Sequence, residues 1–154
     1  MKKSNTWPIV ILIVVAITAV IIFHKKRAEQ QVATSTAPAI VGCYVAHLSQ
    51  DVYILKINSE DSENFAGVLS FQNFDKDSSH GTYMGTYHDD ILLGEYSFSS
   101  EGTDSVRQVI FKKSGENFIE GFGPYDANGD KFLDPNSVTY DPNSTFMPTE
   151  NCPI

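Results

Sequence analysis

The chain has 154 residues, enough for about one domain, and its 11 basic and 19 acidic side chains are unevenly distributed. Residues 1–34 carry a formal charge of +4, from five basic side chains and one acid, whereas residues 35–154 carry −12, from six basic and 18 acidic side chains. Nucleic-acid binding needs clustered Lys and Arg, so that class of partner is excluded. The apolar residues that recur throughout residues 35–154 exclude intrinsic disorder for most of the chain.

An uncharged apolar run, WPIVILIVVAITAVIIF, occupies residues 7–23. In a helix, at about 1.5 Å per residue, it spans roughly 25 Å, close to the thickness of a bilayer core. We expect a transmembrane anchor at 7–23, preceded by a cytoplasmic N-terminus at 1–6 and followed by a basic flank and linker at 24–41. The alternatives are a buried core helix, a cleaved signal peptide, and a lipidated Cys43 at the end of the lipobox-like sequence IVGC.

Two cysteines, Cys43 and Cys152, stand at the two ends of the remaining sequence. A disulfide between them would close a loop of about 110 residues and would imply an oxidising compartment; the alternative is two free thiols in a reducing one. The flank after the apolar run carries three positive charges and the flank before it two, which weakly favours a cytoplasmic domain. We give the cysteines more weight and expect a single-pass protein of the cell membrane, with an extracytoplasmic β domain at 42–154.

That domain has the pattern of short β-strands separated by turn signals, with no sustained helical periodicity. We expect strands at residues 43–48, 51–58, 65–74, 80–88, 91–99, 105–113, 117–123 and 137–140. The short connectors indicate antiparallel hairpins. The fold class is therefore all-β: a small up-and-down, lipocalin-like barrel of about eight strands in which the first strand pairs with the last. A two-sheet β-sandwich is the alternative.

Several segments resemble a known family: GCY at 42–44, GTYMGTYHDDILLGEYSF at 81–98, SEGTDSVRQVIFKK at 100–113, IEGFG at 119–123 and MPTENCP at 147–153. The sequence is similar to a family of small bacterial envelope proteins, lipoproteins or membrane-anchored proteins without an assigned activity. The resemblance covers roughly residues 42–153. It implies an envelope location and a β fold and transfers no catalytic residue. The sequence departs from the pattern by carrying an apolar anchor where many relatives would have a lipobox.

One acidic segment resembles half of a calcium-binding loop. Asp126, Asn128 and Asp130 match its D-x-N-x-D start, but Lys131 stands where Gly is required and Ser137 where a bidentate Glu is required. Asn128-Gly129 is also a hairpin-turn signal, so we favour a turn and keep calcium as the weaker hypothesis. The tetrapeptide Asp-Pro-Asn-Ser, which occurs at 134–137 and at 141–144, indicates two further turns.

No motif of a hydrolase, metalloprotease, nucleotide-binding or dinucleotide-binding enzyme is present, so we expect a non-enzymatic domain without a cofactor. Arg107 is the one arginine after residue 34. It is interpreted either as a clamp for a ligand carboxylate or, as we favour, as part of a structural ion pair with Glu95, Glu101 or Glu120. The aromatic residues suit core packing or the lining of a cavity. The candidate ligand-binding residues are Tyr83, Tyr87, Glu95, Tyr96, Arg107 and Glu120.

These patterns favour a membrane-anchored barrel that binds a ligand outside the membrane. The expected ligand is a small apolar molecule in the barrel lumen. One alternative is an acidic surface that recognises or inhibits a cationic protein or peptide, since the domain carries a formal charge of −12. The other is an enzyme that uses Glu95 or Glu120 in the lumen as an acid or base.

Overall fold

The computed structural model describes residues 40–154. The anchor expected at 7–23, with the segment before it and nearly all of the linker at 24–41, lies outside the described residues. Within residues 40–154, no helix has the length and apolar character needed to cross a membrane.

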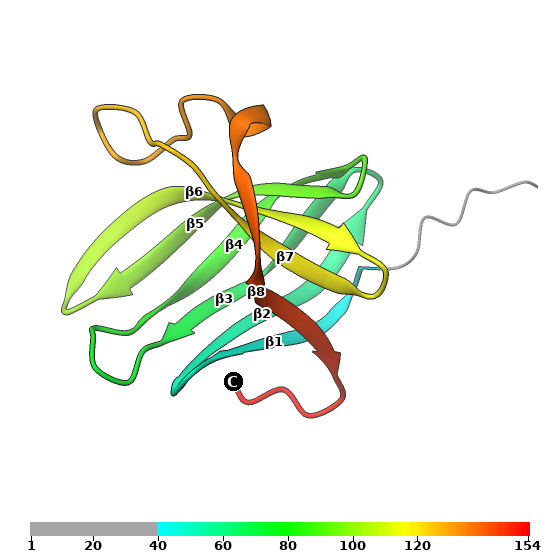
Figure 1. Ribbon diagram of the computed structural model, residues 1–154, viewed down its shortest axis with the longest axis horizontal. Coiled ribbons are helices and arrows are strands. Elements are labelled where there is room, and N and C mark those ends of the chain that lie inside the picture. Colours follow the sequence, from blue (N-terminus) through cyan, green and yellow to red (C-terminus); the bar gives the residue numbers. More distant parts are fainter. Residues whose placement is uncertain (1–39) are drawn as a thin grey trace, which may run out of the picture. The chain divides into compact units, whose positions relative to one another are not determined.

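Eight antiparallel strands close into a barrel in chain order, from β1 to β8 (Figure 1). Their bounds are β1 Gly42–Leu48, β2 Asp51–Asp61, β3 Asn64–Gln72, β4 Ser79–His88, β5 Ile91–Ser100, β6 Thr103–Ser114, β7 Asn117–Phe122 and β8 Thr139–Thr149, with a short 3₁₀ helix, η1, at Pro135–Ser137. The first strand pairs with the last, since Tyr44 lies opposite Pro148. The predicted up-and-down barrel is therefore confirmed, and the two-sheet sandwich is wrong.

The turns gather at two ends of the barrel (Figure 1). The β1–β2, β3–β4 and β5–β6 connections lie at one end, which we call the mouth, and the β2–β3, β4–β5 and β6–β7 connections lie at the other, which we call the closed end. Several connections are two residues long and use left-handed backbone conformations. Asp89 and Asp90 of the β4–β5 turn, with φ of 49° and 63°, are an example. Such turns match the twist of the flanking strands.

The closed end is covered by the residue that leads into β1. Ile40 is fully buried, its amide donates a hydrogen bond to Oε2 of Glu60 at 3.2 Å, and its carbonyl accepts one from the Tyr44 hydroxyl at 2.9 Å. Behind it, fully buried aromatic rings fill the middle of the barrel: Tyr83, Tyr96, Phe111, Phe118 and Phe146. Phe111 meets the rings of Tyr83 and Phe146 edge-on. The lumen is therefore a packed core from the closed end to the middle of the barrel.

Strands β4 and β5 approach one another closely at glycines. A Cβ on Gly81 would lie 1.9 Å from the carbonyl oxygen of Ser97, and one on Gly85 would lie 2.1 Å from that of Leu93. No side chain of any kind fits at such distances without movement of the backbone. The lack of a Cβ at these two positions thus allows the close approach of the two strands.

We expect Gly81→Ala to lower the free energy of unfolding by about 2 kcal/mol or more, because the added methyl group forces the β4–β5 ladder apart. Denaturant unfolding followed by circular dichroism measures this change. Thr82→Ala, at an exposed position of the same strand, is the matched control. Equal stability of the two variants would contradict the close approach.

The last strand is longer than predicted. The sequence indicated a strand at 137–140, but Ser137 ends η1 and β8 runs from Thr139 to Thr149. Ile119 lies opposite Thr145 and Gly121 lies opposite Tyr140, so residues 141–144 form a bulge that faces the single residue Glu120. The prediction was wrong because the Asp-Pro turn signal was taken as the end of the strand, whereas the strand continues beyond the bulge.

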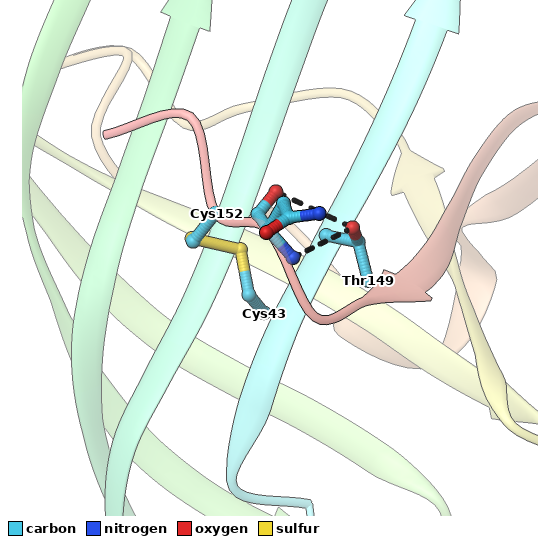
Figure 2. Close-up of a disulfide and its surroundings, with 4 residues drawn as sticks. Cys43, Thr149 and Cys152 are labelled. Carbon is cyan, nitrogen blue, oxygen red and sulfur yellow. Dashed lines mark hydrogen bonds between the residues drawn. A yellow bond between two sulfur atoms is a disulfide. The ribbon is translucent and has the colours of Figure 1, made fainter.

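The predicted disulfide between Cys43 and Cys152 is confirmed, with a Cα–Cα distance of 5.8 Å (Figure 2). Cys43 pairs with Thr149 at the seam between β1 and β8. Thr149 and Asn151 exchange hydrogen bonds of 3.3 Å in the turn that leads to Cys152. The bond thus joins the C-terminal segment to the outer face of the barrel, where Cys43 packs with Val45 and Ile54.

Candidate ligand-binding site at the mouth of the barrel

A cavity of about 470 Å³ opens at the mouth. Its walls come from the strands β1 to β7 and from the β3–β4 connection. The lining residues are Leu48, Tyr53, Phe71, Asn73, Lys76, Asp77, Ser79, Phe98, Ser100, Arg107, Glu120 and Phe122. This volume lies in the range of ordinary small-molecule sites, and the mixture of aromatic rings with a few charged groups is typical of them.

Arg107 lies in the half of β6 that extends past β7, since pairing with β7 begins at Ile110. Its guanidinium carbon is 5.2 Å from the ring centre of Phe98, 5.6 Å from that of Phe71 and 5.9 Å from that of Tyr96. These distances are those of cation–π contacts.

Among the described residues, the guanidinium group of Arg107 has no acidic partner within 4.0 Å. Its Nε is buried without a hydrogen bond, and within residues 40–154 no carboxylate lies within 4.0 Å of it. The ion pair favoured by the sequence is therefore not formed. The physical reason is that three aromatic rings, and not a carboxylate, occupy the space beside the group.

Glu120, on β7, is the buried carboxylate of the site, with 7% of its surface exposed. Its Oε2 accepts a hydrogen bond from the Ser144 hydroxyl at 3.0 Å. Burial raises the pKa of Glu120 to about 7, although the Ser144 hydrogen bond and the positive charge of Arg107 both act to lower it. Near neutral pH this group therefore changes charge inside the barrel.

The Ser144 hydroxyl reaches Glu120 because of the bulge in β8. Within the second Asp-Pro-Asn-Ser tetrapeptide, Oδ1 of Asp141 accepts a hydrogen bond from the Asn143 amide at 2.9 Å. The first copy makes the same turn, with Asp134 accepting from the Asn136 amide at 2.9 Å. The predicted turns are confirmed. Sequence reasoning missed the role of Ser144, and the signal that could have found it is the turn motif that interrupts the last strand.

The other sequence-predicted site residues are divided among the mouth, the core and the outer surface. Tyr96 lies beneath Arg107, and its hydroxyl donates to the Ser79 hydroxyl at 3.1 Å. Tyr83 and Tyr87 are buried away from the mouth: the Tyr83 hydroxyl donates to the carbonyl of Val109 at 2.8 Å, and the Tyr87 hydroxyl donates to Asp90 at 3.1 Å. Their inward direction was predictable, but both side chains pack in the core and neither lines the cavity.

Glu95 lies on the outer face of β5, between the inward-facing Gly94 and Tyr96, and is exposed. The hypothesis that it is a lumen carboxylate, or a partner of Arg107, is therefore wrong. Glu95 pairs with Met84 and Gln108 on the neighbouring strands, and all three side chains belong to the outer face. The alternation of β5 decides this, because a strand directs successive side chains to opposite faces.

The segment with Asp126, Asn128 and Asp130 forms the turn that the sequence favoured. Oδ1 of Asp126 accepts hydrogen bonds from the amides of Asn128, Gly129 and Asp130 at 3.0–3.3 Å. In the described part of the chain, no three His, Cys, Asp or Glu side chains gather as a metal site. Because Oδ1 of Asp126 already accepts these backbone hydrogen bonds, the geometry of the turn does not support the calcium hypothesis.

This turn instead supports the strand that carries Arg107. The Gln108 amide donates to the Asp130 carbonyl at 2.6 Å, and the Gln108 side-chain oxygen accepts from the Phe132 amide at 3.0 Å. The Tyr125 hydroxyl donates to the Gln108 carbonyl at 2.8 Å. The β7–β8 connection thus takes the place of β7 beside this part of β6. It satisfies backbone groups next to Arg107 that would otherwise lack partners.

No protein-family model matches the chain, and no curated protein or solved structure matches it either.

Proposed function

We propose that this protein is a non-enzymatic binding protein whose β-barrel holds a small ligand in the mouth cavity. The observation that carries the proposal is the Arg107 guanidinium, which stands in a cavity of about 470 Å³ without an acidic partner among the described residues. A buried or half-buried polar group without a partner costs free energy. A ligand that completes the contacts of the Arg107 guanidinium would explain why this group stands at the open end of a packed barrel.

The proposal places the ligand at the mouth and not deep in the lumen. Fully buried aromatic side chains fill the middle of the barrel, and Ile40 covers the closed end. The ligand therefore contacts the aromatic rings that line the mouth cavity, Tyr53, Phe71 and Phe98, together with the polar groups around them.

We further propose that the barrel is anchored to the cell membrane through residues 7–23 and lies outside the cytoplasm. The apolar run supports the anchor, the Cys43–Cys152 disulfide supports an oxidising compartment, and the resemblance to bacterial envelope proteins supports the same location. Protease treatment of intact bacterial cells that express the chain tests this placement. Degradation of the barrel in intact cells or in spheroplasts supports it, and protection in both contradicts it.

A fragment screen with a plugged variant tests the binding function. The full-length chain in an uncharged detergent is titrated with a library of small fragments, and binding is followed by amide chemical shifts. We expect saturable shifts at Tyr53, Asn73 and Phe98, and their loss in Ser100→Trp, since Ser100 lines the cavity and an indole there fills it. The hydroxyl of Ser100 donates a hydrogen bond to the carbonyl of Ser78 at 3.1 Å, and we expect the fold to tolerate its loss.

Ser99→Trp is the matched control, because Ser99 is the neighbouring exposed residue on the outer face of β5. It should bind the same fragments as the wild type. Binding that survives in Ser100→Trp, or that maps to the outer face, would contradict the proposal.

A second candidate function, an enzyme with Glu120 as general acid or base, is favoured by one observation. Burial raises the pKa of Glu120 to about 7, which suits proton transfer near neutral pH. Mass spectrometry of bound fragments after prolonged incubation distinguishes the two. Unchanged fragments support binding alone, whereas conversion that stops in Glu120→Gln supports the enzyme.

A further inference from the structure

The chemistry around Arg107 identifies the class of ligand, an inference that rests on the proposed binding function. A guanidinium group stays charged at all ordinary pH values and offers its donors at the edge of a plane. Here the ring centres of Phe71, Tyr96 and Phe98 lie 5.2–5.9 Å from the guanidinium carbon, and no acidic side chain among residues 40–154 pairs with the group. The partner that would complete this site is an anion, and a carboxylate suits a guanidinium group because it can accept two hydrogen bonds from it.

The rest of the cavity indicates what the anion is attached to. Leu48, Tyr53, Phe71, Phe98 and Phe122 supply apolar surface beside Arg107. Phe122 is about half exposed, as is expected of an apolar side chain at a rim. A free inorganic anion would leave these surfaces uncovered, whereas a molecule with a short apolar or aromatic body would cover them.

We propose that the mouth binds small monocarboxylates with an aromatic or short apolar body, whose carboxylate pairs with Arg107 while the body lies on the surrounding rings. The proposal also assigns a role to Glu120. When ionised, Glu120 and the ligand compete for the positive charge of Arg107, so binding of the ligand is accompanied by proton uptake at Glu120.

The sign of this coupling follows from the groups that face Glu120. Arg107, on β6, lowers its pKa, and a bound carboxylate offsets that effect, so the pKa of Glu120 rises on binding. Tyr53, Tyr83 and Tyr125 also interact electrostatically with Glu120, and their own pKa values are raised from 10.0, chiefly by burial, so all three stay neutral near pH 7. Lys76 and Asp77, on the exposed β3–β4 connection, add opposite charges at the rim. Affinity should therefore be higher below pH 7 than above it.

Calorimetric titration of the full-length chain in an uncharged detergent tests the proposal, with phenylacetate, benzoate and hexanoate as probes. We expect at least one of them to bind, and its uncharged amide to bind roughly tenfold more weakly or worse, since a charge-assisted hydrogen bond is lost. Arg107→Met should weaken binding of the acid by a similar factor, and Arg107→Lys should fall between. Lys112→Met, which removes a cation from the outer face of the same strand, should change nothing.

The pH dependence is the second readout. Between about pH 6 and about pH 8 the wild type should lose up to about tenfold in affinity, whereas Glu120→Gln should show no such change. Equal affinity for acid and amide, unaffected by Arg107→Met, would overturn the inference while leaving a ligand site at the mouth intact. Failure of all three acids would also overturn it, and the fragment screen then decides separately whether the mouth binds anything.

Discussion

Removal of the Cys43–Cys152 disulfide is expected to lower the free energy of unfolding by about 4–5 kcal/mol. The bond joins residues 109 positions apart, and in the chain-entropy model a loop of this length restricts the unfolded chain by that amount. The barrel gives a second reason for a large effect. Cys43 pairs with Thr149 at the seam where the first and last strands meet, so the bond reinforces the strand pairing that is most distant in sequence among residues 40–154.

The double variant Cys43→Ala/Cys152→Ala measures this effect by denaturant unfolding of the full-length chain, followed by circular dichroism. Small domains have total stabilities of about 5–15 kcal/mol, so the variant should be marginally folded, or in a parallel thermal unfolding scan its midpoint should be about 15 °C lower or more. The wild type with its disulfide reduced is the matched control and should lose the same amount. A difference below about 1 kcal/mol would mean that the strand ladder alone closes the barrel.

Glu120→Gln is expected to remove a pH dependence of stability worth about 3 kcal/mol. In the folded protein the pKa of Glu120 is about 7, raised from 4.5 by burial. Between these two pH values the folded state binds the proton more tightly than the unfolded state does. The contribution of protonated Glu120 to the free energy of unfolding is therefore fully present below about pH 4.5. It decreases as the pH rises and is lost above about pH 7. Each unit of pKa difference corresponds to about 1.4 kcal/mol, which gives this magnitude.

Stability profiles from about pH 4 to about pH 9 test the assignment, since the difference in slope between variants does not depend on the absolute cost of the substitution. The side-chain carbonyl of the introduced glutamine would retain the hydrogen bond from Ser144, so we expect a folded variant with a flatter profile. Glu95→Gln, which removes an exposed carboxylate from the outer face of β5, should reproduce the wild-type profile. Parallel profiles for the wild type and Glu120→Gln would show that Glu120 is already ionised in the folded state below pH 7.

The strands of the barrel were predictable because alternation is a local property. Tyr83 and Tyr87, or Leu92 and Tyr96, are spaced so that they can only share one face of a strand, and the short connectors leave hairpins as the simple solution. Closure was predictable from the cysteines at the two ends of the domain. The last strand was not, because Pro142 and the Asp141 turn interrupt the alternation in the middle of β8.

The site was predictable only in part. The sequence placed both Arg107 and Glu120 among the candidates. Their separate surroundings depend on three-dimensional packing: rings from β3 and β5 around Arg107, and the Ser144 hydroxyl from a bulge beside Glu120. A local sequence pattern does not indicate whether an inward-facing tyrosine lines a cavity or packs in the core. The buried Tyr83 and Tyr87 could therefore not be distinguished by sequence from Tyr53, which lines the cavity.

Whether the mouth of the barrel is a ligand site is decided most directly by locating a bound ligand. Intermolecular NOEs between the tightest-binding fragment and the full-length chain in an uncharged, deuterated detergent give that location. We expect NOEs to the ring protons of Phe71 and Phe98, which line the cavity beside Arg107. NOEs confined to outer-face side chains such as Val106 or Met147 would show that the ligand binds elsewhere and that the mouth is not the site.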